Sequence, residues 1–452
     1  MGENTIENSD FFFHNGTKYN VREYLGAELE AAYSSLGGNK NYSWRDGGWR
    51  SYNDRVREHF SELPLNIYEL EVSRWKRFGN DNALASELAT YVKQMGYTHI
   101  CVRDALERFC ADTLMPFVDQ MHEAGIGVVL VCRFDKAHSD SEKALIAYAL
   151  CCLDIFHADG LKISKSCLPQ WLLRKSPEDR TNFFQLLKLT VKASFPSALM
   201  ISEGDEECVD DTGGFDFECD ISRMRALLDY IAENSLFRKH HHEKLTSFSR
   251  KKTIFPISYT EGRALCDESF GDSWQKFATS RAALAYQMTV PSKKLCFMGE
   301  EIAFGGDGEI DWSLLKDEAH ARFQLYVSEL NSLYLENSPL WQSDFSDNGF
   351  EWIDSCDRER SVVSYRRRDK SGKELIVAVN FTPVARENYL LGVPCAGEYE
   401  EIFNSDSERF GGSGVINRGV LVGSGEPWNE LPDSVSLRLP PLGVTVIRHK
   451  NS

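Results

Sequence analysis

The sequence has no run of about 18 consecutive apolar residues, which is the length that a membrane-spanning helix requires. Its start, Met1 to Asp10, is polar and acidic, so it lacks the basic and then apolar order of a secretory signal peptide. Basic residues are also scarce, since 51 Lys and Arg face 68 Asp and Glu and give a net charge of -17. We therefore expect a cytoplasmic protein that binds neither a membrane nor nucleic acid.

Patterns typical of disulfides and metal sites are absent as well. The 12 cysteines include the adjacent pair Cys151 and Cys152 but no C-x-x-C motif, which argues against a disulfide framework and against a zinc site. His240 to His242 are consecutive, so on a helix they face different directions, and we predict no metal there. We expect no cofactor.

Short apolar runs alternate with amphipathic helical stretches from residue 64 onward. The run Asn66 to Leu70, for example, is followed by apolar residues at helical spacing from Leu84 to a stop at Gly96. Eight such strand candidates predict an α/β fold, a closed parallel (β/α)8 TIM barrel. The candidates are 66–70, 99–102, 128–132, 159–164, 199–201, 215–217, 253–257 and 295–298, of which 215–217 is the weakest.

The two ends of the chain have a different texture. Short β-type runs beyond residue 340, separated by turns at Asp369 to Gly372 and Gly411 to Gly414, predict a C-terminal antiparallel β domain. The first 63 residues are rich in Asn, Ser, Gly and aromatic residues, and we interpret them as an arm that packs on the barrel. The predicted domains are therefore 1–63 (arm), 64–340 (barrel) and 341–452 (all-β domain).

Several motifs are specific enough to indicate a family. They are V-A-V-N-F-T-P-V-A-R-E-N-Y (Val377 to Tyr389), F-N-S-D-S-E-R-F-G-G-S-G (Phe403 to Gly414), L-P-P-L-G (Leu439 to Gly443) and K-K-L-C-F-M-G-E-E (Lys293 to Glu301). With them, most of the chain resembles the bacterial 1,4-α-glucan (glycogen) branching enzymes of the α-amylase superfamily. The arm is similar to the entry of that family's carbohydrate-binding module, but the module itself is missing before Asn66.

The resemblance implies a retaining reaction, which needs two carboxyl groups about 5 to 5.5 Å apart, a nucleophile and an acid/base. The family's nucleophile strand, approximately D-A-L-R-V-D, falls on Asp159 to Ser164. Asp159 then matches, Lys162 takes the place of the Arg, and Ser164 takes the place of the nucleophile. A neutral serine hydroxyl with no evident base cannot do this work. The resemblance implies substrate-binding roles for Asp159 and Lys162.

The acid/base position falls on Glu203 in L-M-I-S-E-G. This carboxylate is either a leftover group that is ion-paired to Lys162 or one that keeps a chemical role. The family's S-H-D-E segment reads S-Y-T-E here, so Tyr259 replaces a substrate-binding His and Thr260 replaces the third catalytic carboxylate. The resemblance implies that Tyr259 and Glu261 would contact substrate.

The resemblance and its departures leave two functions open. The first is a degenerate homologue that is catalytically silent and acts as a glucan-binding, scaffolding or regulatory protein, with glycogen or maltooligosaccharide as ligand and an active paralogue or other protein as partner. The second is an active branching enzyme, which cleaves α-1,4 bonds and transfers the chain to form α-1,6 bonds in glycogen biosynthesis. The loss of two of three catalytic carboxylates favours the first.

Overall fold

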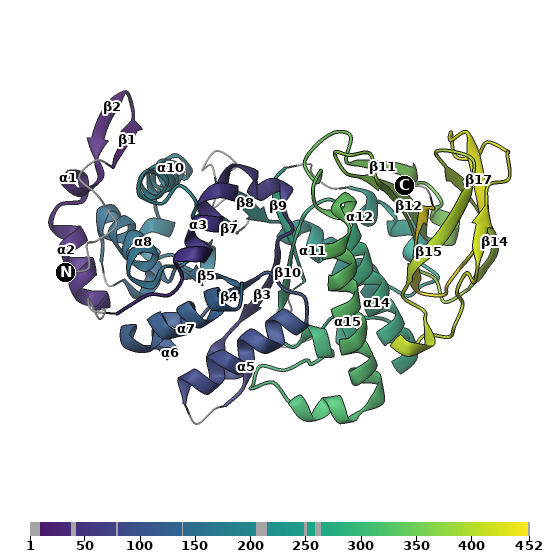
Figure 1. Cartoon of the computed structure of the whole chain (residues 1–452), viewed down its shortest axis with the longest axis horizontal. Helices are drawn as coiled ribbons and strands as arrows, with labels where there is room; N and C mark the ends of the chain where they lie inside the picture. The colour runs from purple at the N-terminus through teal and green to yellow at the C-terminus, as the bar shows by residue number, and fades with distance from the viewer. Residues whose placement is uncertain are drawn as a thin grey trace. The chain divides into compact units, whose positions relative to one another are not determined.

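The structure is a computed structural model that describes residues 10–37, 42–77, 80–137, 139–204, 215–247, 251–257 and 264–450 (Figure 1). The chain divides into two compact units. One consists of residues 1–60 and 67–221, and the other of residues 61–66 and 222–452. These bounds differ from the predicted borders at residues 63 and 340, so the three-part division stays a prediction.

Eight parallel strands close into a barrel in the order β10-β3-β4-β5-β6-β7-β8-β9. Six of them are buried along their whole length, as expected for strands that are covered on both faces. The predicted (β/α)8 barrel is confirmed, and each strand candidate overlaps a strand, although the weakest, 215–217, shares only Phe217 with β8. The strands are β3 (Asn66–Leu70), β4 (His99–Val102), β5 (Gly127–Val131), β6 (Gly160–Ser164), β7 (Leu199–Glu203), β8 (Phe217–Cys219), β9 (Thr253–Ile257) and β10 (Lys293–Phe297).

The barrel helices begin at recognisable capping residues. Asn80, Ser141, Ser176 and Asp272 each accept a hydrogen bond on the side chain from a backbone N–H of the first helical turn. These residues precede α5 (Asp81–Gln94), α8 (Glu142–Phe156), α10 (Pro177–Ser194) and α14 (Ser273–Thr289). The other helices of this region are α4 (Val72–Trp75), α6 (Ala105–Arg108), α7 (Ala111–Glu123), α9 (Gln170–Leu173), α11 (Ile221–Ala232), α12 (Glu243–Thr246), α13 (Leu265–Glu268) and α15 (Glu318–Glu336).

The N-terminal arm has more regular structure than its composition suggests. It contains the hairpin of β1 (Phe11–His14) and β2 (Thr17–Asn20), followed by α1 (Val21–Leu25), α2 (Ala27–Leu36) and α3 (Gly47–Val56). The prediction that it packs on the barrel domain is confirmed, because α2 lies against α8 and the Tyr33 hydroxyl donates a hydrogen bond to Asp154.

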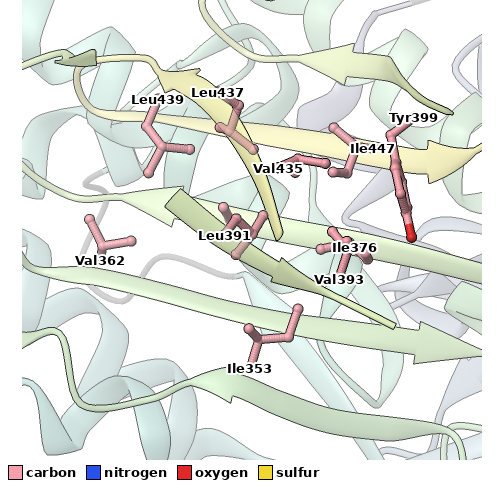
Figure 2. Close-up of a cluster of buried hydrophobic side chains, with 11 residues drawn as sticks. Ile353, Val362, Ile376, Leu391, Val393, Tyr399, Val435, Leu437, Leu439 and Ile447 are labelled. Carbon is pink, nitrogen blue, oxygen red and sulfur yellow. The ribbon is translucent and has the colours of Figure 1, made fainter. Parts of the chain in front are cut away.

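The C-terminal strands form two antiparallel sheets, as predicted. One sheet has six strands in the order β11-β12-β13-β18-β15-β16, and the other pairs β14 with β17. Figure 2 shows the apolar core between them, in which Leu391 of β14 and Val435 of β17 face Ile376 of β13. The strands are β11 (Phe350–Asp354), β12 (Val362–Arg368), β13 (Glu374–Asn380), β14 (Arg386–Val393), β15 (Glu398–Asn404), β16 (Val420–Val422), β17 (Asp433–Leu439) and β18 (Gly443–His449).

The described ranges lack two kinds of feature. No helix within them is both long enough and apolar enough to cross a membrane. No group of three or more His, Cys, Asp or Glu side chains in the same ranges has an arrangement that could hold a metal ion.

Candidate functional site

The candidate site lies in the first unit, where β3, β4, β6 and β7 end. The C-terminal ends of parallel barrel strands are where enzymes of this architecture carry out their chemistry. Ser164 ends β6 and Glu203 ends β7, and the two residues are register partners on neighbouring strands. The structure therefore places side by side the two residues that the family resemblance assigns to the nucleophile and acid/base positions.

A buried ion network centres on Lys162, two residues before Ser164 on the same face of β6. Its Nζ donates to both oxygens of Glu69, at 2.8 and 2.9 Å. The two side chains are 2% and 1% exposed. Arg103, which directly follows β4, donates from Nε to Glu69 Oε1 at 2.9 Å. A carboxylate from β3 is therefore shared between two cations.

Burial alone would penalise both charges, but their mutual attraction outweighs that penalty. Burial lowers the pKa of Lys162, yet Glu69 and Glu203 raise it well above its ordinary value. Burial likewise raises the pKa of Glu69, whereas Lys162 and Arg103 together bring it below its ordinary value. The pair is therefore an ammonium and a carboxylate throughout the neutral pH range.

Glu203 is the retained carboxylate, and it lies against the same ammonium. Its Oε2 forms an ion pair with Lys162 Nζ that lacks hydrogen-bond geometry. The Glu203 side chain is 20% exposed. Lys162 therefore bridges a carboxylate of β3 and a carboxylate of β7.

Among the described residues, Ser164 has none of the neighbours that activate a serine. Its Oγ shares a hydrogen bond with Ser166 Oγ at 3.0 Å. Within the described part of the chain, no carboxylate or imidazole is hydrogen-bonded to Ser164, so nothing there removes its proton.

The other predicted site residues separate into two groups. Tyr259, Thr260 and Glu261 follow β9, but they lie outside the described residues, so their roles stay predictions. Asp159 precedes β6, at the strand end opposite to Ser164, and its side chain is 7% exposed. This position does not agree with the expected substrate contact of Asp159 at the barrel mouth, because a side chain before the strand cannot reach the site beyond it.

Asp159 is instead saturated by protein donors. It accepts hydrogen bonds from Val128 N at 2.6 Å, Trp49 Nε1 at 2.7 Å, Asn53 Nδ2 at 2.5 Å and His122 Nε2 at 2.9 Å. Burial raises the pKa of Asp159, but the attraction and hydrogen bond of His122 lead to a net lowering. Its role is to anchor the base of the barrel.

Glu69 and Arg103 were not among the predicted site residues. A usable signal was present, because Glu69 is a charged residue inside the strand N-I-Y-E-L and a fully buried Glu is rare unless it is paired. The identity of its partners was not visible, since Lys162 is 93 residues away in sequence.

Comparison with known proteins gives the class of this fold. Residues 352–450 match the family described as "Alpha amylase, C-terminal all-beta domain". The α-amylase of Geobacillus thermoleovorans, complexed with acarbose, superposes with a TM-score of 0.62 at 14% identity, over 85% of this chain and 98% of that one. AmyP in complex with maltose gives 0.63 at 12% identity, over 87% and 98%. The fold is that of the α-amylase-type barrel proteins.

Relatives with higher sequence identity define the family. The 1,4-alpha-glucan branching enzyme GlgB of Nitrosomonas eutropha is 32% identical over 90% of this chain and 68% of that protein. GlgB of Halothermothrix orenii is 32% identical over 86% of this chain and 77% of its own. GlgB of Aquifex aeolicus is 31% identical over 91% and 80%. The chain belongs to the 1,4-alpha-glucan branching enzyme family, as its motifs predicted.

Proposed function

We propose that this chain is a catalytically silent member of the branching enzyme family, a pseudoenzyme that binds α-glucan or serves as a scaffolding or regulatory protein. The observation that carries the proposal is the register pair Ser164 and Glu203. Neighbouring strands lie about 4.8 Å apart, so a carboxylate at residue 164 would stand near the spacing that a retaining reaction needs. A hydroxyl occupies that position instead.

The absence of a nucleophile stops formation of the covalent intermediate. Loss of one member of a catalytic set commonly costs about 10^4 to 10^6 in rate.

The ligand part of the proposal rests on relatives. Proteins of the same fold are complexed with acarbose and with maltose, so we propose an α-glucan such as glycogen or a maltooligosaccharide as ligand. An active paralogue or another protein as partner, a cytoplasmic location, and the division into domains 1–63, 64–340 and 341–452 belong to this proposal as well.

A second candidate function is supported by family membership and by the survival of Glu203. In this alternative the chain is an active branching enzyme that cleaves α-1,4 bonds and forms α-1,6 bonds.

Incubation with amylose separates the two functions. We expect purified protein to produce no fall in iodine absorbance and no new α-1,6 linkages, while GlgB of Aquifex aeolicus, assayed in parallel, produces both. Branching by this chain above the background of an inactive preparation would refute catalytic silence.

Binding and residual geometry need separate measurements. In affinity electrophoresis, glycogen in the gel should retard the protein, and unchanged mobility would remove glucan recognition while leaving a role in protein interaction. Replacing Ser164 and Thr260 together by Asp restores two carboxylates. We expect no recovered activity, because Tyr259 still replaces the substrate-binding His of the family. Recovery would show that the substrate groove has kept its geometry.

A further inference from the structure

A segment of the arm, residues 42–56, is tied to helix α7 and to the start of β6. We call it the basal segment. Tyr42 donates from its hydroxyl to Asp119 Oδ2 at 2.9 Å, and Arg45 donates to the same carboxylate from N and Nε, both at 3.0 Å. Asp119 is fully buried on α7, one turn before His122. The next residue of the segment, Asp46, contacts that histidine.

His122 lies between two carboxylates from different elements. Its Nδ1 is 3.2 Å from Asp46 Oδ2 in the basal segment, and its Nε2 is 2.9 Å from Asp159 Oδ2 at the start of β6. An ionised carboxylate only accepts hydrogen bonds, so both ring nitrogens must carry a hydrogen and the ring is an imidazolium. The indole of Trp49 stacks on it at a centroid distance of 5.6 Å and an interplanar angle of 19°.

The surrounding titratable groups do not replace this cation. His157 Nδ1 is 2.8 Å from Asp46 Oδ2, and its Nε2 is 3.3 Å from Arg50 Nη1. Since arginine can only donate, Nε2 accepts its hydrogen bond, and Nδ1 faces Asp46. Burial lowers the pKa of His99 to about 4, so this ring, 6.5 Å from Trp49, is neutral above that pH.

We propose that the protonated ring of His122 is a latch between the basal segment and the barrel, and that loss of one of its two ring N–H protons weakens the attachment of the segment and favours its opening. This inference does not depend on the proposed function, because it concerns the strand ends opposite to Ser164. The reason is that a protonated imidazole has two N–H hydrogens, one for each of the two carboxylates. A neutral imidazole has one, so one of the two carboxylates would face a lone pair instead of a donor.

The charges that face His122 determine the pH range in which the segment is released. Burial lowers the pKa of His122, but Asp159 and Asp46 outweigh this and raise it to about 9, above the ordinary 6.5. A group with a raised pKa stabilises the closed state fully below its ordinary value and stops doing so as pH rises through 9. Between pH 7.5 and 9.5 the equilibrium constant for release should rise about 20-fold. Tyr42 does not interfere, because burial and Asp119 raise its pKa to about 12.

A cavity of about 50 Å³ lies beside Asp159, lined by residues that include Arg50, Asn53, His157 and Ser197. Its size is sufficient for an ordered water molecule next to this carboxylate.

Hydrogen exchange tests the latch. Exchange of peptides from residues 42–56 in the full chain is measured at pH 7.5 and 9.5, and each rate is divided by that of the unfolded chain at the same pH. We expect a loss of protection of about 20-fold in the basal segment, and none in α5. In His122→Gln the segment should be poorly protected at both pH values.

Asp46→Asn provides a second variant that keeps the His122 contact with Asp159. One of the two anions beside His122 is then removed, so the loss of protection between the two pH values should shrink to about a few-fold. Equal protection at the two pH values in the natural chain would overturn the proposal. A loss of protection of about 20-fold between the two pH values that persists in either variant would also overturn the proposal, since another group would then be responsible.

Discussion

Replacement of Lys162 by Met is the perturbation that best tests the ion network at the barrel mouth. Glu69 would lose the hydrogen bonds of 2.8 and 2.9 Å while it stays 1% exposed. Removing one partner of a buried ion pair costs about 3 to 5 kcal/mol. Arg103 still reaches Glu69 Oε1, and Glu203 is 20% exposed and can be hydrated. We therefore expect Lys162→Met to lower the free energy of unfolding by about 3 kcal/mol, the low end of this range.

Urea unfolding followed by circular dichroism measures this loss, with Lys175→Met as the matched control. Lys175 and Glu142 also form an ion pair in the first unit, but their side chains are 35% and 31% exposed, so the control should lose less than about 1 kcal/mol. The double variant Glu69→Gln, Lys162→Met should lose less than the sum of its single changes, because it leaves no buried charge unpaired. If Lys162→Met costs no more than the control, the reasoning about the buried pair is wrong.

Two further predictions concern other parts of the chain. A Cβ at Gly127 would lie 2.1 Å from His99 Cδ2, so Gly127→Ala should destabilise the protein by about 1 to 3 kcal/mol in urea unfolding, whereas Gly308→Ala, with no atom within 4 Å, should change little. Burial, together with nearby acidic groups, raises the pKa of Glu300 to about 8, so its contribution to stability is complete below its ordinary value of 4.5 and is lost as pH rises through 8. Glu300→Gln keeps an acceptor for Leu265 N and should be more stable than the natural chain by a few kcal/mol at pH 9 but not at pH 4, and equal pH profiles would contradict this.

The barrel could be predicted from the sequence because its strands are short, largely apolar runs in a regular order. Such a run indicates by itself that the strand is buried. The arm helices gave no such signal. α2 buries only Leu29 and α3 buries only Asn53, so neither shows an apolar face at helical spacing. Composition alone therefore identified an arm without locating its helices.

The site could be predicted where the family pattern fixes a position on a strand. Ser164 and Glu203 were aligned independently and proved to be register partners. Asp159 was misplaced because it matched the same motif, although it precedes the apolar run and so lies at the other strand end. The partners of Lys162 were beyond reach, since β3 and β4 contribute them and no spacing in the sequence reports that proximity.

The hydrogen bonds around Asp159 also decide where the chain can be shortened. The barrel pattern begins at residue 64, and truncation there would keep every barrel strand. It would remove Trp49 and Asn53 as donors to a buried carboxylate, as well as the Asp46 carboxylate that faces His122. The smallest fragment that folds by itself should therefore begin at or before residue 42, well upstream of the border that the sequence pattern marks.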